Sequence, residues 1–214
     1  MNKMILANYS YICFDFDGVI LDTIQLKAEA FTRVYGALEE VQKSYIRDYQ
    51  IKNGGVSRLD KFIHFEKYLF GVELTKSRSE ELSYLLSEYI LDNIDTCSHI
   101  PGVRDFMEKL TRSGVSVCIA TAMPESDLVS ILDRISLTEA VYIAKGGPKE
   151  KIDQLREINE HFCDDRRQGL YFGDNISDFN AATGAKLDFI GVSSENKFWE
   201  RGIRSIVDFR CFVT

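Results

Sequence analysis

Five short apolar runs, each close to a Gly, Asp or Thr, punctuate this chain of 214 residues. They are rich in β-branched and aromatic residues, so they are typical of buried strands; they cover 11–14, 115–120, 141–144, 170–172 and 187–192. Segments with helical spacing lie among them, at 103–111, 125–135, 148–162 and 178–182. This alternation predicts an α/β fold with a Rossmann-like three-layer core, in which helices cover both faces of a parallel sheet.

The interval between the first two predicted strands is too long for this alternation of strand and helix. Roughly ninety residues separate the first two strands, against ~30 for a simple βαβ unit. The interval contains three apolar stripes at helical spacing, around Phe31, Phe62 and Leu86. We therefore expect an all-α helical cap domain at 23–95, inserted into an α/β core formed by 1–22 and 96–214.

The composition suggests a soluble protein. Hydrophobic residues make up 45% and charged residues 28%, and the net charge of -7 disfavours nucleic acid or an anionic membrane as partner. No apolar run approaches the ~20 residues that span a bilayer, and residues 1–10 do not resemble a signal peptide. We expect a cytoplasmic protein, either monomer or homodimer, with no nucleic acid or membrane partner.

The cysteines support a reducing compartment. They are odd in number and form no CxxC pair, which fits free thiols better than a disulfide framework. Two of them sit inside apolar runs, where a small buried thiol is expected. The five are Cys13, Cys97, Cys118, Cys163 and Cys211.

Three of the predicted strands lead directly into a polar residue: Asp15, Thr121 and Asp174. Each residue alone is typical of a turn or a helix cap. In a parallel sheet, however, the carboxyl ends of the strands share one edge, and ligands bind in the crevice there. The sequence therefore predicts that these residues meet in one site.

The segments around these residues resemble the haloacid dehalogenase-like superfamily, in its phosphoglycolate phosphatase and beta-phosphoglucomutase-like branch with a helical cap. The likeness covers nearly the whole chain, and the matching segments occur in the order of the family. They are Asp15-Phe-Asp-Gly-Val, Ile119-Ala-Thr-Ala, Gly147-Pro-Lys-Glu-Lys and Gly173-Asp-Asn-Ile-Ser-Asp178.

The resemblance implies aspartyl-phosphate chemistry dependent on Mg²⁺. Asp15 is expected to be the nucleophile and Asp17 the acid and base, while Gly18 lets the backbone turn closely around the phosphate. Asp15, Asp174 and the carbonyl of Asp17 are expected to hold the metal, and Asp178 to support the metal's waters or to ligate it.

The phosphate needs donors and a cation. The Thr121 hydroxyl and backbone N–H groups near Ala122 are expected to bind phosphoryl oxygens. Among nearby lysines, Lys151 heads the apolar row of its predicted helix, whereas Lys149 lies on a solvated face. We therefore expect Lys151 to contact the phosphate, with Lys149 as the alternative. The row is Leu155, Ile158 and Phe162.

The predicted cap contains one further candidate. Ser57 and Asp60 form a capping box, so a helix is expected to begin at Arg58, where the helix dipole disfavours a cation. Gly55-Val-Ser-Arg58 resembles the loop of the beta-phosphoglucomutase branch whose arginine grips a substrate phosphate. A surface arginine is an equally good interpretation. The aromatic tail, which includes Phe198 and Trp199, is expected to pack on the core.

These observations favour a phosphatase for a small phosphorylated metabolite, such as phosphoglycolate or a sugar phosphate. Asp17 supports this class, because by resemblance the dehalogenase and phosphonate-cleaving members lack an acid there. A phosphomutase of the beta-phosphoglucomutase type is one alternative. A non-catalytic phosphometabolite-binding domain is another, although the complete set of candidate catalytic residues disfavours it.

Overall fold

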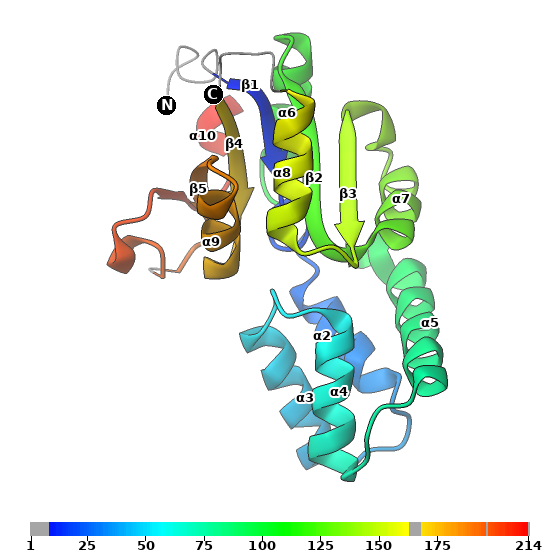
Figure 1. The fold of residues 1–214 in the computed structure, drawn as a ribbon. Helices are drawn as coiled ribbons and strands as arrows, with labels where there is room; N and C mark the ends of the chain where they lie inside the picture. Colours follow the sequence, from blue (N-terminus) through cyan, green and yellow to red (C-terminus); the bar gives the residue numbers. More distant parts are fainter. Residues whose placement is uncertain (1–8, 163–167, 196, 214) are drawn as a thin grey trace. The chain divides into compact units, whose positions relative to one another are not determined.

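The computed structural model describes residues 9–162, 168–195 and 197–213 (Figure 1). Its chain divides into two compact units. One unit runs to Asp22 and resumes at Ser98, and the other is Thr23–Cys97. Cys163 lies outside the described residues, whereas Cys13 and Cys118 are buried free thiols as predicted.

The first unit is built on a six-stranded parallel sheet with strand order β3-β2-β1-β4-β5-β6 (Figure 1). The chain moves from β1 outward to β3 and then returns to the other side of β1. The strands are β1 (Tyr9–Phe14), β2 (Ser116–Pro124), β3 (Ile143–Gly147), β4 (Gln168–Gly173), β5 (Asp188–Val192) and β6 (Ser205–Ile206).

Helices cover both faces of the sheet, which confirms the predicted three-layer α/β core (Figure 1). On one face Tyr11 and Tyr171 pack with Leu155 and Ala182 from two helices. On the other, Phe14 and Phe172 pack against aromatic rings of α6 and the chain's end. The helices of this unit are α6 (Val103–Arg112), α7 (Glu125–Arg134), α8 (Lys151–His161), α9 (Ile176–Gly184) and α10 (Arg210–Val213), with short 3-10 turns η2 (Thr138–Ala140) and η3 (Trp199–Arg201).

The second unit is helical throughout its regular structure. Phe31, Phe62 and Phe65 form its aromatic core. Its elements are α2 (Ile24–Arg33), α3 (Glu40–Lys52), α4 (Arg58–Phe70), α5 (Lys76–Asn93) and the 3-10 turn η1 (Ile94–Thr96). In the part of the chain that the structure describes, no helix is long and apolar enough to cross a membrane.

The segments that lead into and out of the helical unit lie side by side. The Asp22 N–H donates to the Ser98 carbonyl at 2.9 Å, and the Ile100 N–H donates to the Ile20 carbonyl at 3.0 Å. An antiparallel bridge joins Leu21 to His99 between them. The insertion therefore leaves and re-enters the α/β unit at one place.

Two expectations about packing and boundaries are wrong. Trp199 is 79% exposed, although Phe198, Phe209 and Phe212 of the same tail are buried. Helix α8 begins at Lys151 instead of Pro148, because the backbone is still extended at Glu150, the residue that precedes the first helical turn.

Candidate active site

Asp15 lies at the carboxyl end of β1, where the sheet reverses its strand order. Its N–H continues the ladder to β4 by donating to the Phe172 carbonyl at 2.8 Å. The residue is 5% exposed, and its Oδ1 accepts a hydrogen bond from the Phe16 N–H at 2.8 Å. Asp174 follows β4, the neighbour of β1, so the two carboxylates meet at a typical ligand-binding edge.

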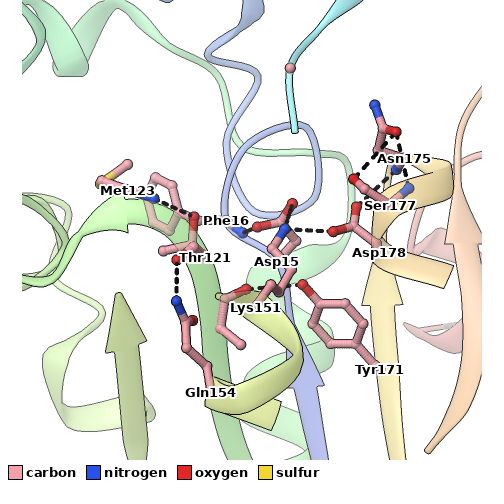
Figure 2. A network of polar contacts seen from close by, with 12 residues as sticks. Asp15, Phe16, Thr121, Met123, Lys151, Gln154, Tyr171, Asn175, Ser177 and Asp178 are labelled. Atoms are coloured by element: carbon pink, nitrogen blue, oxygen red, sulfur yellow. Dashed lines mark hydrogen bonds and ion pairs between the residues drawn. The ribbon is translucent and has the colours of Figure 1, made fainter. Parts of the chain in front are cut away.

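Lys151 brings a positive charge to this edge from α8. Its Nζ lies 2.9 Å from Asp15 Oδ2 and 2.5 Å from Asp178 Oδ1 (Figure 2). Leu155 and Ile158, which are fully buried on the same helix face, fix the helix to the sheet. Burial alone would lower the pKa of Lys151, but Asp15 and Asp178 outweigh it and raise this pKa, so the ammonium stays charged.

Three carboxylates gather around this lysine. Oxygen atoms of Asp15, Asp174 and Asp178 all lie within 4.8 Å of one another. Asp178 is fully buried and is held in place, because its Oδ2 accepts from the Asn175 N–H at 2.9 Å in the capping box of α9. Figure 2 shows this contact beside the Asp15–Lys151 pair.

The carboxylates lack sufficient positive charge nearby. Burial, reinforced by the neighbouring carboxylates and opposed by Lys151, raises the pKa of Asp15 to about 8. Burial and Asp178 likewise raise the pKa of Asp174 to about 7, although Lys197 and Lys151 oppose the rise. Hard oxygen donors with uncompensated negative charge suit Mg²⁺, so the residues present fit the predicted metal.

Two glycines leave room for the carboxylates. A Cβ at Gly173 would lie 2.3 Å from Asp178 Cβ, so only glycine lets α9 approach β4 this closely. Gly18 has a φ of +73° and faces Asp174, whose Oδ2 would lie 2.9 Å from an added Cβ. Gly18 therefore allows the backbone to approach this carboxylate closely, while its approach to a phosphate stays a prediction.

The Thr121 hydroxyl is oriented by the backbone. Thr121 is 1% exposed, and its Oγ1 accepts from the Met123 N–H at 3.3 Å. Because the oxygen is the acceptor, the hydroxyl proton can be donated to another group. Ala122, the other predicted donor position, follows directly and is half-buried.

The remaining candidates have other neighbours. Lys149 has a 60% exposed side chain that pairs with Glu157, so Lys151 and not Lys149 is the lysine at the carboxylates. Asp17 is half-buried; its charge contributes to the raised pKa of both Asp15 and Asp174, which places it near them.

Arg58 belongs to the helical unit. Helix α4 begins there with Ser57 as its cap, as predicted. The Arg58 Nη1 donates to the Ser83 carbonyl at 3.3 Å and to Ser87 Oγ at 2.8 Å. The side chain thus joins α4 to α5.

Two residues near the site escaped the sequence analysis. Lys197 follows β5 and lowers the pKa of Asp174 through its charge; its position after a strand was the available signal. Gln154 is buried beside Lys151 and contacts Thr121. A lone polar residue next to the apolar row of α8 could have indicated it.

A comparison with known families decides the assignment. The profile described as haloacid dehalogenase-like hydrolase matches residues 12–192. The chain belongs to this family. The matched range contains every candidate at the carboxylate cluster, from Asp15 to Asp178.

Two individual relatives are named as phosphatases. A phosphorylated carbohydrates phosphatase of Thermotoga maritima is 29% identical over 130 residues, which is 59% of this chain and 56% of that protein. The match thus spans little more than half of the Thermotoga protein. A phosphoglycolate phosphatase of Pseudomonas putida is 23% identical over 199 residues, or 85% of this chain and 68% of that protein.

Solved structures share the fold. CbbY from Rhodobacter sphaeroides in complex with phosphate has a TM-score of 0.76 at 17% identity, covering 94% of this chain and 95% of that one. A haloacid dehalogenase-superfamily hydrolase from Geobacter sulfurreducens has a TM-score of 0.63 at 17% identity, covering 96% and 95%. Both likenesses support the α/β core with a helical insertion.

Proposed function

We propose that this protein is a Mg²⁺-dependent phosphatase that hydrolyses a small phosphorylated metabolite through an aspartyl-phosphate on Asp15. The observation that carries the proposal is the Asp15 carboxylate beside a buried ammonium, in a cluster with two further carboxylates. The phosphatase relatives support the same reaction class.

The chemistry divides into two displacements. In the first, an Asp15 carboxylate oxygen attacks phosphorus, the ester P–O bond breaks, and Asp17 gives its proton to the leaving alkoxide. In the second, water attacks the phosphorus of the aspartyl-phosphate and gives a proton to Asp17. Phosphate leaves and the Asp15 carboxylate is restored.

The surrounding residues hold the phosphoryl group. Thr121 donates its hydroxyl proton to a phosphoryl oxygen, assisted by the backbone near Ala122, while Lys151 offsets negative charge. Asp15, Asp174 and the Asp17 carbonyl would hold Mg²⁺, with Asp178 in support. The ion would supply positive charge between the nucleophile and the phosphate.

The test is Asp15→Asn, assayed for phosphate release from a panel of phosphorylated metabolites with and without Mg²⁺. We expect the activity to fall by about 10³-fold or more, because the amide is a poor nucleophile. Asp153→Asn is the control, since Asp153 is an exposed residue of α8 that pairs with Arg156. Unchanged phosphate release in Asp15→Asn contradicts the proposal.

A phosphomutase remains the second candidate, on the ground of the Gly55-Val-Ser-Arg58 loop. A mutase isomerises a sugar phosphate with little net release of phosphate. A phosphatase releases one phosphate for each ester consumed. Quantifying both products from the same sugar phosphate separates the two activities.

A further inference from the structure

Gln154 is a buried polar side chain with no role in the chemistry described above. It is 1% exposed and lies on α8, one turn beyond Lys151. Its Nε2 donates to the Thr121 carbonyl at 3.0 Å and to the Lys149 carbonyl at 2.9 Å. One amide group therefore touches both segments that carry the proposed phosphate-binding groups.

The contact with Thr121 satisfies a buried carbonyl in an irregular stretch of β2. The register between β2 and β3 shifts between Ala120 and Pro124, and Thr121 lies within this irregular stretch. A buried carbonyl without a donor weakens a fold, and Gln154 supplies the donor (Figure 2). The Thr121 backbone, and with it the hydroxyl, is fixed to α8 at this point.

The contact with Lys149 acts on the other segment. Lys149 stands two residues before Lys151, in the turn that enters α8. Anchoring its carbonyl holds the start of the helix, where the Lys151 side chain departs toward Asp15. The two hydrogen bonds together set the spacing between the Thr121 hydroxyl and the Lys151 ammonium.

The oxygen of the same amide has no such contact with the described part of the chain. Among the described residues, Gln154 Oε1 is buried without a hydrogen-bond partner. An unpartnered buried oxygen is unfavourable, and an apolar side chain of similar length would avoid it. The two N–H donors are thus what distinguishes glutamine at this position.

We propose that Gln154 is a positioning residue that sets Thr121 and Lys151 at the spacing required to hold a phosphoryl group. This inference deepens the proposed phosphatase function and rests on it. Gln154 itself does not contact the substrate.

The test is Gln154→Met, which keeps the length of the side chain and removes both donors. We expect kcat/KM for phosphate release to fall by about 10- to 100-fold, mostly through kcat, because the donors are misplaced during phosphoryl transfer. We also expect orthovanadate, a phosphate analogue, to stabilise the Mg²⁺-loaded variant less than the wild type in thermal unfolding.

Asn159→Leu is the matched control on the same helix. Asn159 accepts a hydrogen bond from the Tyr11 hydroxyl at 2.9 Å, so its loss also removes a tie between α8 and the sheet. It lies about 7 Å further along the helix axis than Gln154. We expect Asn159→Leu to lower Tm about as much as Gln154→Met does. Its kcat/KM and its stabilisation by vanadate should stay within about twofold of the wild-type values.

The outcomes separate the two proposals. If Gln154→Met matches Asn159→Leu in both kcat/KM and vanadate stabilisation, Gln154 has only a structural role. If the wild type is stabilised by vanadate but hydrolyses no ester, the phosphatase function is wrong, and vanadate stabilisation still decides the role of Gln154. A wild type with neither property overturns both.

Discussion

The Lys151 ammonium contacts Asp15 and Asp178 at once, in a place where neither carboxylate has much access to water. Removing a buried partner leaves unpaired charge, which is costlier than losing an exposed pair. The geometry of the Lys151–Asp178 pair is also fixed, since Asp178 is held by α9 and Lys151 by α8. At this scale the site is an arrangement of buried charges in which one ammonium faces several carboxylates.

Lys151→Met tests that arrangement. We expect kcat/KM for phosphate release to fall by about 10²- to 10³-fold, because the charge that offsets the phosphate is lost. Lys149→Met is the control, and we expect it to change the rate by less than about threefold, since Lys149 faces Glu157 in solvent. Equal losses in the two variants would show that the lysine has been misassigned.

Gly173→Ala tests the approach of α9 to β4. An added methyl group would collide with Asp178 Cβ and displace the carboxylate that supports Lys151 and the metal site. We expect the activity at saturating substrate to fall by about 10- to 100-fold and the Mg²⁺ requirement to rise. Gly54→Ala is the control, as nothing lies within 4 Å of its added Cβ. An unchanged Mg²⁺ titration would contradict this view of Gly173.

The sequence predicts the position of a residue where an apolar pattern around it indicates which side of an element is buried. Lys151 could be chosen over Lys149 because the apolar row of α8 continues into the buried Leu155 and Ile158. Its place beside the apolar row of α8 could have indicated that Gln154 is buried, but not its contact with Thr121, which depends on an irregular stretch of β2 that no local pattern marks. Trp199 was misplaced because an aromatic residue among buried neighbours gives no sign of its own exposure.

At the scale of elements, Arg58 has a packing role. Its guanidinium joins α4 to α5 through Ser83 and Ser87. The sequence predicted a phosphate contact for the same side chain. Stability and KM report on these two roles separately.

Arg58→Ala and Ser87→Ala together resolve the roles. We expect Ser87→Ala to lower the free energy of unfolding by about 1 kcal/mol, because it removes one hydrogen bond between the helices, and Arg58→Ala by about 2 kcal/mol, because it removes this bond and the one to the Ser83 carbonyl. Only Arg58→Ala should raise KM for the substrate, by about 10-fold, if the arginine also binds phosphate. Denaturant unfolding and steady-state kinetics measure the two effects. Equal KM values in the two variants would leave Arg58 with the packing role alone.

Some elements could not be recognised from the periodicity of apolar residues in the sequence. Strand β6 has only two residues, too few to form a recognisable apolar run. Helix α3 buries few side chains, chiefly Ile46 and Gln50, so it carries no clear stripe. Strands β1, β2 and β4 were recognisable because burial on both faces demands continuous apolar runs, whereas β3 lies at the sheet edge, is mostly half-buried and overlaps the predicted run by two residues only.

For the whole molecule, the carboxylate cluster couples stability to pH, and the proposed Mg²⁺ would act on the same groups. A carboxyl whose pKa is raised on folding binds a proton in the folded state that the unfolded state lacks, so stability is lost as pH rises through the raised pKa. The ordinary pKa of these carboxyls is 3.8 and the raised values are about 8 for Asp15 and about 7 for Asp174, so the loss begins at about pH 4 and is complete near pH 8. Bound Mg²⁺ would replace these protons.

We therefore expect opposite trends without and with the metal. In the presence of a chelator, Tm should fall from pH 6 to pH 8. The gain in Tm on adding Mg²⁺ should be larger at pH 8 than at pH 6, where protons compete for the same oxygens. Thermal unfolding with Mg²⁺ or chelator at several pH values measures both. A gain that does not depend on pH would argue against metal binding at these carboxylates.

The hydrogen bond between Asp22 and Ser98 holds the two ends of the helical insertion together at one place in the α/β unit. The polypeptide leaves and re-enters the unit at neighbouring residues, so the geometry of the sheet does not depend on how many residues lie between them. In the course of evolution, this junction can accept insertions of different length and shape while β1 and α6 keep their places. The helical unit can then vary while the carboxylate cluster keeps its geometry.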